Sequence, residues 1–348
     1  MEKIEANRNF ANKLWNCCKF VTVNALKDIS DEEAAELSVK GPILKEEFDN
    51  LLLPEQYIIS KCHELVASVT EQIENYQLGA AGSLVYAFLW DLYADWYIEI
   101  SKTRLYEGLG GNSEEEAKMA RRVLVYVLDT SLRLLHPYMP YVTEQLWHHL
   151  PRAEVSADQS AHALMLSDWP QMDDSKPLVT SKDVVASFEC FQALTRSIRN
   201  ARAEYNVEPA KRVSAVIVAK PEILQQLEAE KRSLVALAKL EPEEVHFYEI
   251  GSSDAKDAIS DSVQLVIQDG VEAYLPLSGL IDPEKERNRL EKQNEKLTKE
   301  IQKLAGRLKS KGFVDKAPEA VVEKARKELA ELEEQASKVQ SSLKSLPS

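Results

Sequence analysis

The sequence predicts a mainly α-helical protein: a helical bundle, a small α/β segment and an antiparallel coiled-coil hairpin. Three observations support this class. Apolar residues recur at helical spacing through most of the first 205 residues, the period changes to that of β-strands after Pro209, and two heptad seams follow Asp282. We therefore expect a helical bundle at 1–205, a small α/β subdomain at 206–281 and the hairpin at 282–348.

The bundle is expected to consist of long helices separated by polar breaks. Gly79 and Gly82 mark one break. An acidic loop or short helix is expected at 28–53, and a connection rich in Ser, Asp and Pro at 151–181. The helices themselves are expected at residues 2–27, 54–77, 83–105, 114–135, 143–150 and 182–205.

A corner between two of these helices has the sequence LLHPYMPYVTEQLW, at residues 134–147. Proline fixes its own φ and restricts the residue before it. We therefore expect His136-Pro137 to end the incoming helix and Met139-Pro140 to set the direction of the next one. Thr143 is the candidate N-cap of that next helix.

The α/β segment should have the order β-α-β-β-β. Strands are predicted at Val213–Val218, Val245–Ile250, Val263–Gln268 and Val271–Leu275, with a helix at 221–239. Asp269-Gly270 is a typical two-residue hairpin turn between the last two strands.

The hairpin is predicted from two apolar seams joined by a short link at 309–317. Residues in each seam are spaced alternately three and four apart, as in a coiled coil, and Asn294 at a seam position should help to fix the register. The stretch 285–316 holds eleven Lys/Arg against five Asp/Glu, although the whole chain carries a net charge of −14. An acidic chain binds nucleic acid only through local basic surfaces, and this stretch is one of them.

Composition excludes several other classes. No apolar run approaches the roughly 18 residues that a membrane-spanning helix needs. The four cysteines, Cys17, Cys18, Cys62 and Cys190, form no CxxC pair, so we expect a reducing compartment and no structural zinc. The sequence after Met1 has neither an apolar signal segment nor a leader rich in Ser and Arg.

The first predicted helix carries the most suggestive surface residues. The stretch RNFANKLWN at 8–16 mixes bases, amides and aromatics. Amides hydrogen-bond base edges, aromatic rings stack on bases, and Arg and Lys contact phosphates, so this stretch suits an RNA-facing helix. The alternative is a surface helix with a packed Phe and Trp. Arg196, Arg199 and Arg202 recur at every third position of a later helix, as either a solvated or a phosphate-binding face.

Three carboxylates, those of Asp91, Asp95 and Glu99, share one face of the helix at 83–105. They could suggest a hydrolase, but neither a nucleophile nor a set of metal ligands accompanies them. We expect them to form ion pairs with Lys102, Arg104 or a neighbouring helix.

Five stretches together resemble the valyl-tRNA synthetase family, in that family's order. They are RNFANKLWN at 8–16, DLYADWYIEISKTRLY at 91–106, LLHPYMPYVTEQLW at 134–147, IRNARAEYNVEPAKR at 198–212 and FVDKAPEAVVEKARKEL at 313–329. Taken by itself, the corner resembles one in the anticodon-binding domain of the class I enzymes for valine, leucine and isoleucine. The C-terminal hairpin separates the valine enzyme from the other two. Cys17-Cys18 departs from the family, which more often has a small residue followed by a larger one.

The resemblance implies an anticodon-binding bundle and a tRNA-binding arm that packs on the outer corner of tRNA(Val). It implies a soluble monomer, with no DNA or membrane partner. The implied tRNA contacts are Arg8, Asn12, Lys13, Trp15 and Asn16, secondarily Arg199 and Arg202, and on the arm Lys309, Lys311, Phe313 and Lys316. The three lysines and Phe313 form a base-plus-aromatic cluster, although Phe313 could equally just close the hairpin tip.

The sequence contains neither the HIGH nor the KMSKS signature with which this class of enzyme holds ATP. The resemblance therefore implies tRNA binding without aminoacylation by these residues alone, with no catalytic residue, cofactor or metal in the chain. ATP with Mg²⁺ is implied for the full-length enzyme, in the cytoplasm, chloroplast or mitochondrion. The competing hypothesis is a helical, coiled-coil adaptor without an RNA partner, which the acidic charge favours and the basic hairpin opposes.

Overall fold

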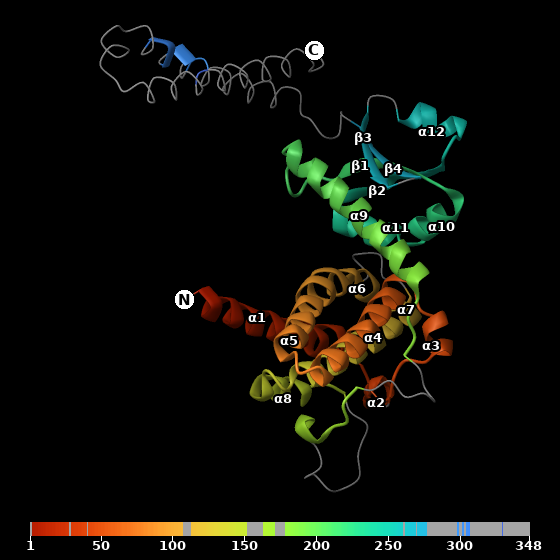
Figure 1. The fold of residues 1–348 in the computed structure, drawn as a ribbon. Helices are drawn as coiled ribbons and strands as arrows, with labels where there is room; N and C mark the ends of the chain where they lie inside the picture. Colours follow the sequence, from red (N-terminus) through yellow and green to blue (C-terminus); the bar gives the residue numbers. More distant parts are fainter. Residues whose placement is uncertain are drawn as a thin grey trace.

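The computed structural model describes residues 2–27, 29–39, 41–106, 113–151, 163–170, 178–259, 262–268 and 270–276, and isolated residues between 298 and 329. It confirms the mainly α-helical class with one small sheet. The helical bundle and the sheet with its helices form two layers that meet along α9, as Figure 1 shows. The predicted coiled-coil hairpin lies almost wholly outside the described residues.

The bundle starts with α1, which passes into a π-helical segment, η1. Helices α2, α7 and α9 each have a serine N-cap: the hydroxyls of Ser30, Ser113 and Ser181 accept hydrogen bonds from backbone amides three residues on. Helix α4 has a proline in its first turn. The elements are α1 Glu2–Lys19, η1 Phe20–Ala25, α2 Asp31–Leu37, α3 Lys45–Asp49, α4 Leu53–Glu74, α5 Leu78–Ala87, η2 Phe88–Tyr97, α6 Ile98–Leu105, α7 Glu114–Leu135, α8 Pro140–Trp147, η5 Leu164–Leu166 and α9 Lys182–Glu204.

The helix expected at 83–105 differs from the prediction. Its middle, η2, is π-helical, so the chain runs from α5 through η2 into α6. The predicted break at Gly79 and Gly82 is also wrong, because both glycines lie inside α5. The turn is made instead by Asn75–Gln77, where Tyr76 has a φ of 59°. Gly82 is needed for packing: a Cβ there would come within 3.0 Å of the Tyr138 ring.

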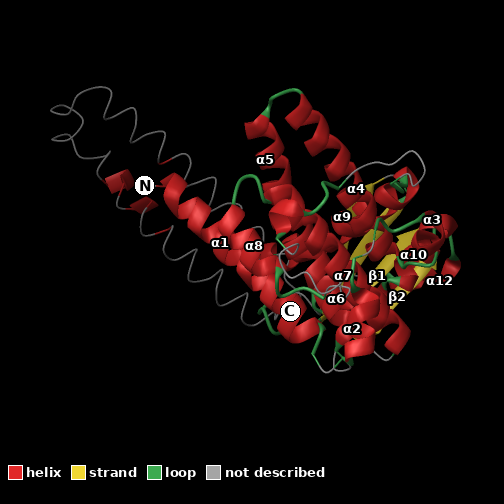
Figure 2. Cartoon of the chain, turned by 90° about the horizontal axis from the view of Figure 1, so that it is seen from below, coloured by secondary structure: helices red, strands yellow, loops and turns green. Residues whose placement is uncertain are grey.

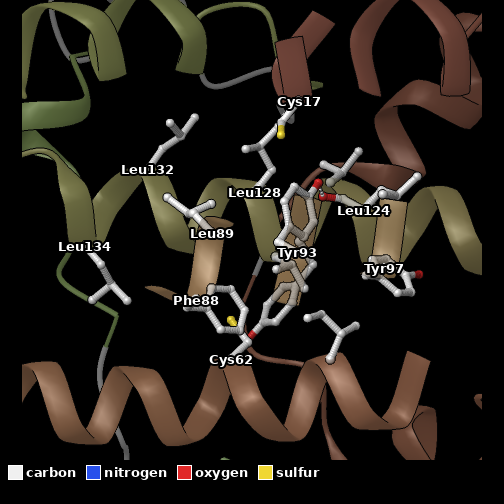
Figure 3. Close-up of a cluster of buried hydrophobic side chains, with 14 of the residues drawn as sticks. Cys17, Cys62, Phe88, Leu89, Tyr93, Tyr97, Leu124, Leu128, Leu132 and Leu134 are labelled. Atoms are coloured by element: carbon white, nitrogen blue, oxygen red, sulfur yellow. Dashed lines mark hydrogen bonds between the residues drawn. The ribbon is translucent and has the colours of Figure 1, made fainter. Parts of the chain in front are cut away.

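The bundle core lies between α1, α4, η2 and α7. Figure 3 shows Cys17 from α1, Cys62 from α4, Tyr93 from η2 and Leu128 from α7 pointing into one cluster. The Tyr93 hydroxyl donates to the carbonyl of Leu124 at 2.9 Å, so this buried polar group is satisfied. The four cysteines are buried and free.

The corner at 134–147 ends α7 at Leu135, as predicted, but α8 begins at Pro140 and ends at Trp147 instead of covering the expected 143–150. The cap prediction is wrong, because Met139 occupies the N-cap position and Thr143 lies inside α8. The Thr143 hydroxyl donates to the Met139 carbonyl at 2.9 Å and lies 2.7 Å from His136 Nδ1. Thr143 therefore ties α8 back to the turn that precedes it.

The second layer is a four-stranded sheet of order β2-β1-β4-β3. Strands β1 and β2 are parallel, and the other neighbours are antiparallel. The helix expected at 221–239 is interrupted at Glu230, and a further short helix, α12, precedes β3. The elements are β1 Val213–Ala219, α10 Pro221–Ala229, α11 Lys231–Ala238, β2 Leu240–Glu249, α12 Ser253–Ala258, β3 Ser262–Gln268 and β4 Val271–Pro276.

Helix α9 joins the two layers. Its Phe188 lies 4.1 Å, between ring centroids, from Tyr57 of α4 and 6.4 Å from Trp96 of η2, and the same core includes residues of β1, β4 and α11. The boundary expected at residue 205 therefore falls at the end of a helix that packs on both sides, and the three-part division stays a prediction.

Candidate nucleic-acid interface

Helix α1 presents one face to the bundle and one to solvent. Phe10, Leu14 and Cys17 are buried. Because a helix repeats every 3.6 residues, this buried face leaves a continuous exposed side. This side carries four exposed residues spaced 4, 3 and 4 apart: Arg8, Asn12, Trp15 and Lys19.

Two of these side chains could reach a ligand directly. The Trp15 side chain is large and apolar, yet the residue is 47% exposed. The Arg8 guanidinium lies 3.5 Å from the Glu5 carboxylate, and both side chains are about two-thirds exposed. Such an exposed pair contributes little to stability, so Arg8 can exchange Glu5 for another anion at small cost.

Lys13 lies on the inner side of α1 and has partners within the protein. Its Nζ donates to Asp95 Oδ1 at 2.7 Å and to the Trp90 carbonyl at 3.2 Å, and it lies 3.8 Å from the centroid of the Trp90 ring. These contacts fix α1 on η2. Lys13 was predicted as a tRNA contact, and the structure gives its ammonium group the additional role of holding the helix in place.

Three carboxylates, those of Asp91, Asp95 and Glu99, were predicted to form ion pairs, and this is confirmed for Asp95 and Glu99. Asp95 pairs with Lys13, and Glu99 pairs with Lys102 at 2.6 Å. Within the part of the chain that the structure describes, no group of three or more His, Cys, Asp or Glu residues could hold a metal ion.

A groove of about 490 Å³ separates α1 from η2 and α6. Its α1 side carries the amides of Asn9, Asn12 and Asn16, which share one helical face. Its other side carries Asp95, Glu99 and Lys102. The amide and carboxylate groups along this groove are suited to hydrogen bonding with base edges.

The secondary candidates, Arg199 and Arg202, lie on α9. Arg202 is buried and donates to the carbonyls of Lys239, Glu208 and Lys211 at 3.1, 3.3 and 2.7 Å. Arg199 Nε donates to the Leu237 carbonyl at 2.8 Å. The structure gives Arg202 a structural role, because its guanidinium donates to carbonyl groups of the loop that follows α9.

The remaining candidates, Lys309, Lys311, Phe313 and Lys316, lie outside the described residues. Sequence reasoning missed Asn9 and Lys102 as groove residues. The signal for Asn9 was its position three and seven residues before Asn12 and Asn16, which places the three amides on one face. No comparable signal existed for Lys102, because it reaches the groove from another helix.

No helix in the described part of the chain has the length and apolar character needed to cross a membrane.

Comparison with known proteins identifies two family matches. Residues 55–217 match the anticodon-binding domain of tRNA ligases, and residues 282–347 match the valyl tRNA synthetase tRNA binding arm. The first match includes the η2–α6 side of the groove and begins after α1.

Curated relatives match almost the whole chain. The chain is 44% identical over 334 residues to a chloroplastic/mitochondrial valine–tRNA ligase of Arabidopsis thaliana, which covers 96% of this chain and 32% of the relative. It is 36% identical to a valine–tRNA ligase of Clostridium acetobutylicum over 93% of this chain and 33% of the relative. A ligase of Synechocystis is 33% identical over 99% of this chain and 35% of the relative. The chain thus spans about a third of the length of the curated relatives it matches.

Proposed function

Because this chain belongs to the valyl-tRNA synthetase family, as the part that matches the C-terminal portion, we propose that it is the tRNA-binding part of a valine–tRNA ligase. The bundle would hold the anticodon stem-loop, and the arm at 282–347 would pack on the outer corner of tRNA(Val). Joining valine to tRNA with ATP and Mg²⁺ would belong to the remaining two-thirds of such an enzyme, in the cytoplasm or in a chloroplast or mitochondrion.

One observation carries the proposal for the bundle: α1 combines an exposed stripe, Arg8, Asn12, Trp15 and Lys19, with an amide-lined groove beside it. A guanidinium and an ammonium group for phosphates, an indole for stacking and amides for base edges are the groups with which proteins bind single-stranded RNA loops. The division into 1–205, 206–281 and 282–348 is part of the same proposal.

The test is a titration of the full chain against a tRNA(Val) transcript at two salt concentrations. We expect binding to weaken on the order of 50-fold between about 50 and about 200 mM salt, as for about four phosphate contacts. Charge reversal of Lys309, Lys311 and Lys316 should reduce this salt dependence. Absence of binding at the lower salt would instead favour the adaptor.

We expect Trp15→Ala to weaken tRNA binding by about 10- to 100-fold, because loss of one aromatic–base stack costs roughly 1–3 kcal/mol. The indole is half exposed, so the melting temperature should stay unchanged. Fluorescence anisotropy with labelled tRNA measures the change. The control is Val266→Ala on β3, an apolar residue in the other layer that is 70% exposed. Equal affinities for both variants would contradict the assignment of Trp15.

A further inference from the structure

A cavity of about 970 Å³ lies where the end of α4, the start of α5 and the corner before α8 meet. These segments form the end of the bundle that lies away from the sheet (Figure 1). The volume falls within the range of small-molecule sites, about 300–1,000 Å³. Most of its wall is apolar or aromatic, from Val66, Ile73, Leu78, Pro137, Tyr138 and Trp169.

Hydrogen bonds within the protein hold the two aromatic side chains of this wall. Trp169 Nε1 donates to the hydroxyl of Thr70 at 3.0 Å, and that hydroxyl donates to the Val66 carbonyl at 2.8 Å. The Tyr138 hydroxyl donates to the Leu78 carbonyl at 2.8 Å. Because these donors are already used, the rings offer a ligand their faces, which suit a flat apolar group or a cation.

The charge of the cavity is negative. Glu71 and Glu74 line it from the last turns of α4, where a spacing of three residues places both carboxylates on one helical face. Both residues are exposed, and among the residues that the structure describes their side chains have no hydrogen-bond or ion-pair partner. The described lining residues include neither Lys nor Arg. Such a cavity attracts a cation and repels a phosphate group.

We propose that this cavity binds a small organic ammonium ion with a flat aromatic body. The body lies against the rings of Tyr138 and Trp169, and the ammonium group pairs with Glu71 and Glu74. The site is separate from the exposed face of α1, and its charge is opposite to that needed for an RNA backbone. The inference therefore goes beyond the proposed function and does not depend on it.

The experiment compares three indoles of similar shape and different charge: tryptamine as the cation, indole-3-propionate as the anion and 3-ethylindole as the neutral compound. Each is titrated into the full chain, and the indole N–H signal of Trp169 is followed by nuclear magnetic resonance. The chain has five tryptophans, so Trp169→Phe identifies this signal by its loss. We expect tryptamine to saturate the shift with a Kd on the order of 1 mM or below. It should bind at least about tenfold more tightly than indole-3-propionate, with 3-ethylindole between them.

The double variant Glu71→Gln/Glu74→Gln should remove this preference for the cation. The three affinities should then agree within about threefold, and that for 3-ethylindole should equal the wild-type value, because the apolar wall is unchanged. Glu64→Gln is the matched control, since Glu64 is another exposed carboxylate of α4 but lines a different hollow. It should keep the wild-type order and ratios.

Gly79→Leu tests the location, because Gly79 lines the cavity near the start of α5. A Cβ at this position meets no atom within 4 Å, and leucine favours a helix more than glycine does, so the melting temperature should not fall. The added side chain takes up space that the ligand would fill, and all three probes should bind about tenfold more weakly. Unchanged affinities in Gly79→Leu would overturn the inference, and so would a wild type that binds the anion as tightly as the cation. Both results would leave the tRNA titration unaffected.

Discussion

Replacing Arg104 by methionine should destabilise the protein by about 3–5 kcal/mol, the usual cost of removing one partner of a buried ion pair. The Arg104 side chain is 1% exposed and projects from α6 toward the start of α11. One of its terminal nitrogens donates to both carboxylate oxygens of Glu230 at 2.9 Å, and Ser233 donates to one of them at 2.7 Å. Without the guanidinium, the Glu230 carboxylate stays buried, and the Ser233 hydroxyl remains as its hydrogen-bond donor.

Urea unfolding of the full chain, followed by circular dichroism, measures this loss. The control is Lys102→Met on the same helix, whose ion pair with Glu99 is exposed and should contribute less than about 1 kcal/mol. The double variant Arg104→Met/Glu230→Met should recover more than half of the stability, because apolar side chains can replace a buried pair. A loss below about 1 kcal/mol for Arg104→Met would show that the pair does not join the bundle to the sheet layer.

Local signals fixed some elements of the fold well. Helix α7 has the predicted bounds because Ser113 caps one end and Pro137 follows the other. Strands β1, β3 and β4 match the predictions to within one residue, because β-branched residues and the Asp269-Gly270 turn signal act locally. Strand β2 begins at Leu240, five residues before the predicted Val245. By contrast, the break between α10 and α11 at Glu230 contains neither glycine nor proline, so the sequence did not predict it.

The candidate site was predictable only in part. The exposed face of α1 follows from helical spacing, which is why Arg8 and Trp15 were found. Residue spacing does not predict which element packs against the buried side of a helix. The contacts of Lys13 with Asp95 and of Arg202 with loop carbonyls depend on this packing, so the sequence did not predict them. The second wall of the groove lies about 80 residues further along the chain and was visible only as a row of carboxylates.

Glu55 is one group through which pH should act on the stability of this protein. It lies in the first turn of α4 and is 1% exposed, and neither of its carboxylate oxygens has a hydrogen-bond partner among the residues that the structure describes. Arg104 Nε is 3.9 Å away, while Glu230 and Glu116 add negative charge nearby. Burial outweighs the attraction of Arg104 and raises the pKa of Glu55 from 4.5 to about 7.

The raised pKa sets the sign of the pH dependence. Between pH 4.5 and about 7 the folded protein holds a proton on Glu55 that the unfolded chain has released. Stability from this group is therefore complete below the unfolded pKa and is lost as the pH rises through the folded pKa, by on the order of 3 kcal/mol.

Glu55→Gln should remove this pH dependence, because a glutamine keeps the shape of the protonated acid and carries no charge at any pH. The free energy of unfolding is measured in urea from about pH 5 to about pH 8. The value for the wild type minus that for the variant should fall as the pH rises, because other titrating groups, such as the buried His63 with its pKa lowered to about 4, contribute equally to both proteins. At pH 8 the variant should be the more stable protein, although it has lost a carboxylate beside Arg104, since Glu230 still neutralises the guanidinium.

Glu64→Gln on the same helix, whose carboxylate is 45% exposed, serves as the control and should follow the wild-type curve. If Glu55→Gln instead destabilised the protein at pH 8, Glu55 would be an ionised partner of Arg104, and the cluster would be a buried triad that needs both of its carboxylates charged.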